Sequence, residues 1–374
     1  MNIRKIDTEN RRDARRFVEF PNELYRDCPR WVPLPLNDGL AQLNRRGAYF
    51  LHSDADFLVA EDGDRMLGRL VVMENRHYNE YHQSKHAFFY LFDVVEDFEV
   101  AQKLFEAAIE WAKARGLTKL VGPKGFLPLD GIGMLYQGFE HWPAMGVPYN
   151  YEYYNRFMEQ MGFEKEIDFT SFYANVRDFE LPERIARVAE RVKKRQNLRV
   201  KTFKSKNEVR QWVWPLVQAY NKIFVENWEY VPVTQEETAE LTDRMLQIVQ
   251  PEHIKFIINE SDEVIGFLLT FLNIAEALHK TGGKLFPFGW ITLLRALRNP
   301  KYIDVNGMGI LKEFRGLGGN AILYDELIKT VHAYPSIEHA DMTQMADWVV
   351  FMKADVVSLG GKPYKVHRVY RRDI

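Results

Sequence analysis

Residues 309–327, GILKEFRGLGGNAILYDEL, place an arginine and three glycines between a strand-like and a helix-like stretch. The apolar pattern predicts a strand over 302–311 and a helix over 320–333. The first turn of a helix has main-chain N–H groups without intrahelical partners, and glycines let those groups approach a bulky anion. Together with the Arg315 guanidinium, this junction predicts a binding site for a pyrophosphate.

The same glycine-rich phrase also allows other interpretations. A strand-to-helix turn that binds nothing would have the same composition. A P-loop would need GxxxxGK followed by Ser or Thr, and the chain contains no such phrase. A dinucleotide-binding fingerprint would need GxGxxG, whereas Gly318 and Gly319 are followed by Asn320 and Ala321. Neither common nucleotide motif fits.

The elements around the glycines belong to a pattern that occurs twice. DFLVAEDGDRMLGRLVVM (56–73) and KFIINESDEVIGFLLTF (255–271) each join two apolar stretches through a polar turn. This arrangement is typical of a β-hairpin. Each hairpin is preceded by an aromatic and proline phrase at nearly the same offset, PRWVPL and WEYVPV. The two halves therefore indicate an internal duplication.

The repeat continues downstream with a longer offset. Residues 87–116 predict a strand followed by a helix, as residues 302–334 do, and the change in offset indicates an insertion near 272–290. Each half then ends in a helix and an aromatic strand. We therefore expect a mixed α/β (α+β) fold with two similar domains. The expected limits are 1–178 for the first domain, 179–203 for a linker helix region and 204–374 for the second domain.

The phrase FRGLGGNA, after a strand and before a helix, resembles the acyl-CoA pyrophosphate loop of GNAT N-acetyltransferases, Q/R-x-x-G-x-G/A. Arg315 takes the first position and Gly318 the fourth, while Asn320 replaces the usual Gly or Ala at the sixth. The hairpins around Gly68 and Gly266 look like the second and third GNAT strands. Over most of both halves the chain resembles tandem GNAT-like bacterial proteins.

The resemblance implies acyl transfer from acetyl-CoA or another acyl-CoA to an amine. Main-chain groups on the strand before the loop would hold the pantetheine, and an N–H there would stabilise the oxyanion. The residues that the resemblance assigns to CoA are Gly309, Ile310, Leu311, Arg315, Gly316, Leu317, Gly318, Gly319, Asn320 and Ala321.

The catalytic base is expected among the acidic residues near this strand. Such enzymes often use Asp or Glu there, and Asp304 is the nearest by position; the competing interpretation is a solvent-facing carboxylate. Glu226, in FVENWEYVP, is a second candidate or a polar residue beside an aromatic anchor. The tyrosine that the family often places four residues before a closing glycine is absent, since Val356 stands there relative to Gly360.

The first half lacks the glycine loop. At an offset of 220, residues 95–99 (VEDFE) align with residues 315–319 and contain no glycine but three carboxylates. Negative charges and bulky side chains at this position would repel a pyrophosphate. We therefore expect a degenerate first domain that does not bind CoA and that supplies structure or one wall of an acceptor cleft.

Composition narrows the classes of partner. The chain has 374 residues and a formal charge of −2, which gives no indication of a nucleic-acid partner. One cysteine, Cys28, excludes an internal disulfide, and the spacing of His77, His82 and His86 matches no common metal motif. The start lacks a secretory signal, and no apolar run approaches the roughly 20 residues that span a bilayer. We expect a cytoplasmic protein with no metal and no membrane span.

Three functions fit these features. The leading expectation is an acyl-CoA-dependent N-acyltransferase, most simply an acetyltransferase, acting on an amine-bearing acceptor by direct attack on the thioester. The alternative is a GNAT-like CoA-binding or regulatory protein without catalysis, which the missing helix tyrosine favours. A third is a transferase that uses an aminoacyl-tRNA donor, for which the near-neutral charge gives no support.

Overall fold

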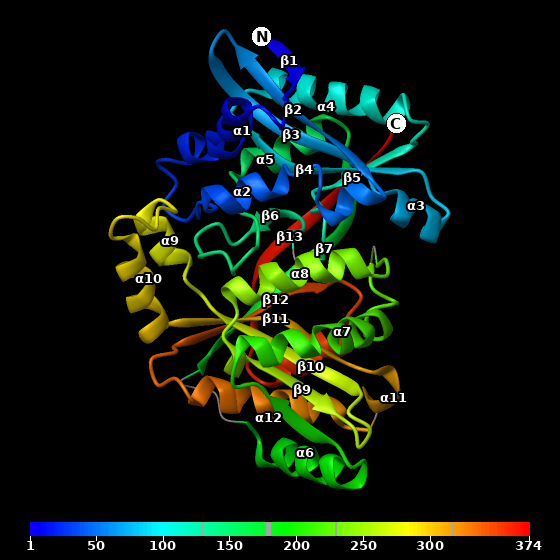
Figure 1. The fold of residues 1–374 in the computed structure, drawn as a ribbon, viewed down its shortest axis with the longest axis vertical. Helices are drawn as coiled ribbons and strands as arrows, with labels where there is room; N and C mark the ends of the chain where they lie inside the picture. Colours follow the sequence, from blue (N-terminus) through cyan, green and yellow to red (C-terminus); the bar gives the residue numbers. More distant parts are fainter. Residues whose placement is uncertain (129, 177–180, 229, 316) are drawn as a thin grey trace. The chain divides into compact units, whose positions relative to one another are not determined.

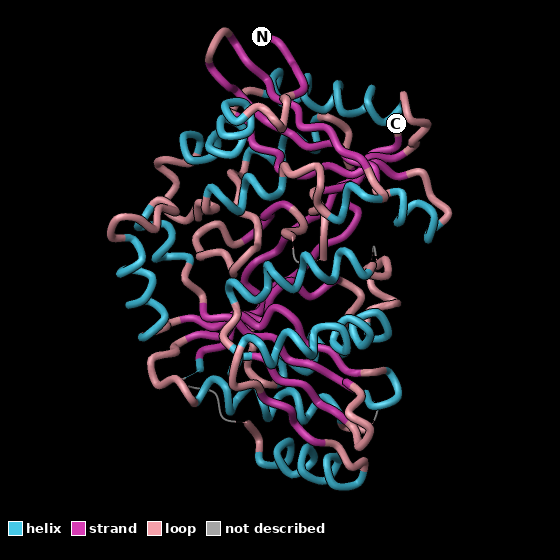
Figure 2. Tube along the Cα trace, viewed as in Figure 1, coloured by secondary structure: helices cyan, strands magenta, loops and turns pink. Residues whose placement is uncertain are grey.

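The computed structural model describes residues 1–374 except 129, 177–180, 229 and 316. Contacts divide the chain into two compact units. Unit 1 consists of Met1–Thr170, Ala275–Leu293 and Lys365–Ile374, and unit 2 of Ser171–Ile274 and Leu294–Tyr364. Helices and strands alternate in both units, so the expected mixed α/β fold class is confirmed (Figures 1 and 2).

In unit 1, neighbouring strands follow the order β1, β2, β3, β4, β5, β13. The first three pairings are antiparallel, and β4 and β5 are parallel. The strands are β1 (Asn2–Lys5), β2 (Asp54–Asp62), β3 (Arg65–Glu74), β4 (His86–Val94), β5 (Lys119–Gly122), β6 (Met134–Gln137), and parts of β7 (Glu164–Asn175) and β13 (Lys362–Asp373). The helices are α1 (Arg11–Leu24), α2 (Leu36–Gln42), the 3-10 helix η1 (Ala48–Leu51), α3 (Arg76–His82), α4 (Phe98–Lys113), α5 (Tyr153–Gln160), α9 (Ala275–Thr281) and the start of α10 (Gly289–Arg298).

Unit 2 repeats this order with β8, β9, β10, β11 and β12. Again three antiparallel pairings are followed by one parallel pairing, between β11 and β12. The strands are β8 (Arg199–Thr202), β9 (Ile254–Ile258), β10 (Val264–Leu272), β11 (Tyr302–Ile310) and β12 (His339–Ala346). The helices are α6 (Glu183–Arg195), α7 (Lys206–Ile223), α8 (Gln235–Ile248), η3 (Pro251–His253), α11 (Lys312–Arg315), α12 (Gly319–His332) and α13 (Val350–Ser358). Both predicted hairpins and the internal repeat are confirmed.

Most of the strand β13, from Lys365 onward, belongs to unit 1. In β13, Tyr370 lies opposite Gly122 of β5, and residues 365–374 group with the first unit by their contacts. Residues 275–293, which overlap the insertion predicted near 272–290, also group with unit 1. The domain limits expected from the sequence stay a prediction, and the first of them falls among residues that are not described. No helix among the described residues has the length and apolar character needed to cross a membrane.

The helix α4 shows how the sequence pattern builds the core of unit 1. Its apolar residues Ala101, Leu104, Phe105 and Ala108 recur at helical spacing and are all buried, in contact with the sheet around β3. The helix begins at Asp97, whose carboxylate accepts a hydrogen bond from the Glu99 N–H. This side chain therefore satisfies one of the N–H groups that open the helix.

A buried ion pair holds α1 and α5 against β3 and β4. Asp93 accepts a hydrogen bond of 2.8 Å from Arg69 Nε and one of 2.9 Å from the Tyr25 hydroxyl. The Tyr154 hydroxyl lies 2.9 Å from that of Tyr25, and burial raises the pKa of both tyrosines, so they stay protonated at neutral pH. The Asp93 carboxylate is therefore a central acceptor in this network.

Replacing this acceptor is expected to destabilise unit 1 strongly. Asp93→Ala leaves the buried Arg69 guanidinium without its carboxylate, so we expect a loss of about 3–5 kcal/mol in the free energy of unfolding, measured with urea. The control is Glu96→Ala, which removes an exposed ion pair with Arg156 and should change stability by less than about 1 kcal/mol. Equal losses in the two variants would contradict this account of the network.

Candidate active site

The parallel strands β11 and β12 pair over only part of their length. They are in register from Tyr302 with His339 to Val305 with Met342. Among the described residues the ladder ends there, although β11 continues to Ile310 and β12 to Ala346. A pair of strands that separates in this way exposes main-chain donors and acceptors on both inner edges. The separation therefore creates a place where an extended ligand can bind the edge of β11.

A β-bulge in β11 follows the last residue that pairs with β12. Met308 lies opposite Leu268 and Val305 opposite Thr270, so β11 contains one extra residue between these pairs. The bulge changes which side chains face each side of the sheet. Asp304, opposite Phe271, therefore shares a face with Gly309 rather than with Met308.

Gly309 lies against the end of α7. A Cβ atom at this position would come within 2.7 Å of the Ile223 side chain and 3.3 Å of the Phe224 ring, so only glycine fits without displacement. The α7 helix therefore covers the face of the sheet that carries Asp304, whereas Met308 points to the face covered by α12.

The N-terminus of α12 follows the separated strand end. Gly318 has a φ of +86°, in the left-handed region that favours glycine, and it gives the helix no side-chain cap. In the described part of the chain, the opening N–H groups of α12 thus differ from those of α4, where Asp97 supplies an acceptor. The positive end of α12 is accordingly suited to an anion from outside the chain.

The two units differ in loop length as well as in composition. The segment between β4 and α4 is residues 95–97, whereas the segment between β11 and α12 is residues 311–318. The loop of the first half is therefore five residues shorter. The sequence alignment of the two halves at an offset of 220 does not show this difference, because it pairs the two segments residue by residue. Gly316, one of the predicted loop residues, lies outside the described residues.

Unit 1 fills the strand end that corresponds to Ile310 with tyrosine hydroxyls, whereas in unit 2 the Ile310 carbonyl accepts a hydrogen bond from Arg315. Val94 lies opposite Gly68 as Ile310 lies opposite Gly266, so the two strand ends correspond. The Val94 N–H donates to the Tyr154 hydroxyl at 2.9 Å, and the Val94 carbonyl accepts from the Tyr153 hydroxyl at 2.6 Å. These hydroxyls occupy the main-chain groups that would otherwise bind an extended ligand in unit 1.

Arg315 binds main-chain carbonyls next to the loop. Its Nε donates to the Ile310 carbonyl at 3.1 Å, and its Nη2 donates to the Ile223 carbonyl at the end of α7, at 2.9 Å. These bonds join the loop to β11 and α7, and a cation is favourable at a helix C-terminus. In this structure Arg315 positions the loop, and its direct contact with a pyrophosphate stays a prediction.

The three residues predicted to hold pantetheine differ in which edge of β11 their main-chain groups face. The Leu311 N–H donates to the Ile265 carbonyl of β10 at 2.9 Å, so it faces the paired side of β11. Main-chain groups alternate between the two edges of a strand, so those of Met308 and Ile310 face the separated side. Met308 is a residue that the sequence analysis missed.

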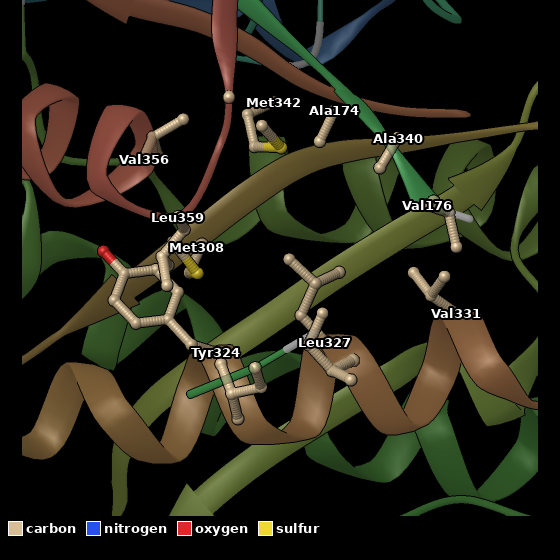
Figure 3. A pocket seen from close by; sticks show the side chains of 13 residues that line it. Ala174, Val176, Met308, Tyr324, Leu327, Val331, Ala340, Met342, Val356 and Leu359 are labelled. Carbon is tan, nitrogen blue, oxygen red and sulfur yellow. The ribbon is translucent and has the colours of Figure 1, made fainter. Parts of the chain in front are cut away.

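An apolar cavity of about 50 Å³ lies in unit 2 next to the separated strands. Figure 3 shows side chains from α12, α13 and the neighbouring strands converging on it. Its lining includes Met308, Tyr324, Leu327, Val331, Met342 and Val356. The Tyr324 hydroxyl lies 3.2 Å from Asp355 Oδ2, and burial raises the pKa of Tyr324. The cavity is suited to methylene groups rather than to a charged group.

Asp304 lies in a buried polar cluster on the α7 face. Its carboxylate is 0% exposed and accepts two hydrogen bonds from Asn273 Nδ2, of 3.1 and 3.0 Å. Asp341 is its register partner on β12 and therefore points to the same face. The structure places Asp304 inside the protein, which differs from the solvent-facing alternative considered for this residue.

Two tyrosines extend this cluster. The Tyr364 hydroxyl donates to Asp341 Oδ2 at 2.6 Å, and burial together with Asp341 raises the pKa of Tyr364. The Tyr173 hydroxyl is hydrogen-bonded to His339 Nδ1, and the two rings pack 4.8 Å apart. Sequence analysis missed these four residues. The available signal was the period-two alternation of polar residues in HADMTQ, 339–344, which indicates a strand with one polar face.

The remaining predicted residues lie around the loop. Glu226 is exposed and accepts a hydrogen bond of 2.7 Å from Lys312, which lowers the pKa of its carboxyl. Leu317 is exposed, Asn320 is half-buried and Ala321 is buried in α12. The geometry thus separates Glu226, an ion-paired surface carboxylate, from the buried Asp304.

Comparison with known proteins shows that the chain has a tandem GNAT-like fold. A solved tandem GNAT protein from the clavulanic acid biosynthesis pathway matches all of this chain and 98% of its own, with a TM-score of 0.58 and 12% sequence identity. No family model matches.

Two proteins resemble the chain in sequence over nearly its whole length. Protein YghO of Escherichia coli is 27% identical over 98% of this chain and 94% of its own length. A bacterial ceramide synthase of Caulobacter vibrioides is 26% identical over 96% of this chain and 94% of its own.

The buried cluster predicts a measurable contribution to stability. Tyr364→Phe removes a hydrogen bond to a buried carboxylate, so we expect unfolding to require roughly 1.5–3 kcal/mol less free energy. Tyr136→Phe is the matched control because its ring, 3.7 Å from the Arg368 guanidinium, is kept; its stability should stay within about 0.5 kcal/mol. If urea unfolding gave the two variants the same stability, the Tyr364 bond would have no such role.

Proposed function

We propose that the chain is an acyl-CoA-dependent N-acyltransferase whose donor site lies in unit 2. The observation that carries this proposal is the end of the β11–β12 ladder beside the glycine-started helix α12. An extended thioester arm can pair with the edge of β11 while its pyrophosphate lies at the N–H groups of α12. The tandem GNAT-like fold supports the same assignment.

The proposed reaction forms an amide. The lone pair of a neutral amine attacks the thioester carbonyl, a C–N bond forms, and the carbonyl oxygen becomes an oxyanion. The C–S bond then breaks, the nitrogen gives up a proton, and CoA leaves as a thiolate that takes a proton. A main-chain N–H at Met308 or Ile310, on the separated edge of β11, is placed to stabilise the oxyanion.

We assign the proton transfer to the polar cluster. Asp304 lies on the α7 face, opposite the cavity, so a donor entering from the α12 face and an amine entering from the α7 face meet at the separated strands. Asp304 is the candidate base, with Asp341 and Tyr364 beside it to relay the proton. The Tyr324 side chain lies at the cavity wall, and its hydroxyl is a candidate acid that would protonate the leaving thiolate.

Unit 1 is proposed to have no donor site. Its short loop, the Asp97 cap and the two tyrosine hydroxyls on Val94 fill the positions that correspond to the donor site in unit 2. This agrees with the degenerate first domain expected from the sequence.

The relative named bacterial ceramide synthase supports amide formation in particular. A ceramide is the amide of a fatty acid with a long-chain amino alcohol, so this name fits acyl transfer to an amine. The apolar lining of the cavity supports a donor with an acyl chain longer than acetyl.

A CoA-binding protein without catalysis is the second candidate. Asp304 is 0% exposed and both of its oxygens accept hydrogen bonds from Asn273, so an amine would have to displace these bonds to reach the carboxylate. This function predicts donor binding without release of CoA.

Release of CoA thiol separates the two candidates. The purified chain is mixed with acetyl-CoA or palmitoyl-CoA and a panel of small and long-chain amines, and the thiol is followed with a chromogenic reagent. Cys28 is buried and is the single cysteine, so the background is low. We expect amine-dependent thiol release, faster with the longer donor. Stabilisation by CoA of about 2.7 kcal/mol at 100 times its Kd, without turnover, would favour the binding protein.

The loop glycine should be needed for donor binding. In Gly318→Ala, a Cβ would lie 2.8 Å from Val188 Cγ1 and the positive φ would be strained, so α12 would shift its N-terminus. We expect CoA affinity, measured calorimetrically, to fall by tenfold or more, since roughly 1.4 kcal/mol is enough for that change. Gly63→Ala has a similar φ of +58° but no atom within 4 Å, and it should bind CoA normally. If Gly318→Ala bound CoA with unchanged affinity, the N-terminus of α12 would not be part of the donor site.

Asp304 should affect the chemical step rather than binding. Asp304→Asn keeps the size of the side chain but removes the basic carboxylate, so we expect kcat to fall by roughly 10²–10⁴ with little change in CoA affinity. Glu226→Gln is the control and should keep kcat, because Glu226 is an exposed, ion-paired residue. Equal activity of the two variants would exclude Asp304 as the base.

A further inference from the structure

The segment from α9 to α10 exposes large apolar side chains. Residues 284–288, KLFPF, are all exposed, with Phe286 83% and Phe288 73% accessible to solvent. Leu285 and Trp290 are also exposed, and α10 contains no buried residue. Exposed apolar side chains this close together mark a surface that binds another apolar phase.

Buried side chains and a hydrogen bond in α9 attach this segment to the rest of unit 1. In α9, Ala275 and Leu278 are buried, and His279 Nδ1 is hydrogen-bonded to the Trp31 carbonyl at 2.8 Å. After the exposed phenylalanines, Trp290 Nε1 donates to the Pro287 carbonyl at 3.0 Å. The apolar side chains are therefore presented by an ordered segment, α9 to α10, drawn in yellow in Figure 1.

The charge of the segment is strongly positive. Residues 275–298 contain Lys280, Lys284, Arg295 and Arg298 and one acidic residue, Glu276, although the whole chain has a formal charge of −2. Lys280 is paired with Glu276 at 2.6 Å, which leaves an excess of three positive charges. The apolar surface is thus flanked by cations.

We propose that residues 284–298 form a membrane-surface element that inserts Phe286 and Phe288 into the interface of a bilayer containing anionic lipids. Aromatic and aliphatic residues next to Lys and Arg are the composition of segments that lie in such an interface. A second copy of this chain fits less well, because a symmetric contact would place two segments of the same charge against each other.

This inference does not rest on the proposed acyltransferase activity. It concerns where the protein binds, and it would give an enzyme with lipid-like substrates access to them at the membrane surface. Vesicle binding is measured without any acyl-CoA or amine, so its failure is distinct from a failure of the transferase proposal.

The test is co-sedimentation of the full chain with vesicles of phosphatidylcholine alone or mixed with phosphatidylglycerol at 7:3. We expect binding to the mixed vesicles that weakens with added salt, because charges at the surface are screened. The double variant Phe286→Ser/Phe288→Ser should bind roughly tenfold less well, because it lacks the two aromatic rings that insert into the bilayer interface. The control Leu51→Ser/Ile248→Ser removes two side chains that are 68% and 57% exposed elsewhere, and it should bind like the unchanged chain.

Charge variants complete the test. Lys284→Gln/Arg295→Gln/Arg298→Gln should bind the mixed vesicles at least about tenfold more weakly. The control Arg191→Gln/Lys194→Gln/Arg195→Gln neutralises exposed residues of α6 and should not. Thermal unfolding verifies that each variant is folded. The proposal is overturned if the unchanged chain stays in the supernatant, if the phenylalanine variant binds as well as its control, or if size-exclusion chromatography shows a dimer that those phenylalanines maintain without lipid.

Discussion

The end of main-chain pairing between β11 and β12 is the constraint on which the proposed site depends. As long as two strands are paired, their peptide groups satisfy each other and bind nothing else. After Val305 the described residues of the two strands continue without this pairing, and the bulge between Val305 and Met308 turns Asp304 and Met308 to opposite faces of the sheet. A polar cluster and an apolar cavity are thereby placed on the two sides of one opening.

The internal repeat makes unit 1 a natural control for unit 2. Both units have the same order of strands, yet unit 1 satisfies its own strand end through Tyr153 and Tyr154 and its own helix end through Asp97. Unit 2 instead begins its helix at Gly318 without a side-chain cap. The same order of strands is thus compatible with a unit whose own side chains complete the main-chain hydrogen bonds and with a unit in which an external ligand would complete them.

Sequence alone predicts the parts of this structure that depend on local pattern. The hairpins, the strand-to-helix junction and the repeat follow from periodicity and turn residues, so their positions agree with the structure. Long-range contacts are different. Nothing local to Arg315 indicates that its guanidinium binds Ile223, and nothing local to Tyr364 indicates its bond to Asp341. These pairings are set by the sheet order, which a single sequence does not specify.

The membership of β13 in unit 1 has a consequence for biosynthesis. Translation delivers residues 1–170 early, but residues 365–374, which include the pairing with β5, are made only after the residues of unit 2. Until then the edge of β5 is incomplete, and unpaired strand edges favour association with other chains. Nascent and truncated forms of this protein should therefore rely on chaperones longer than the size of unit 1 suggests.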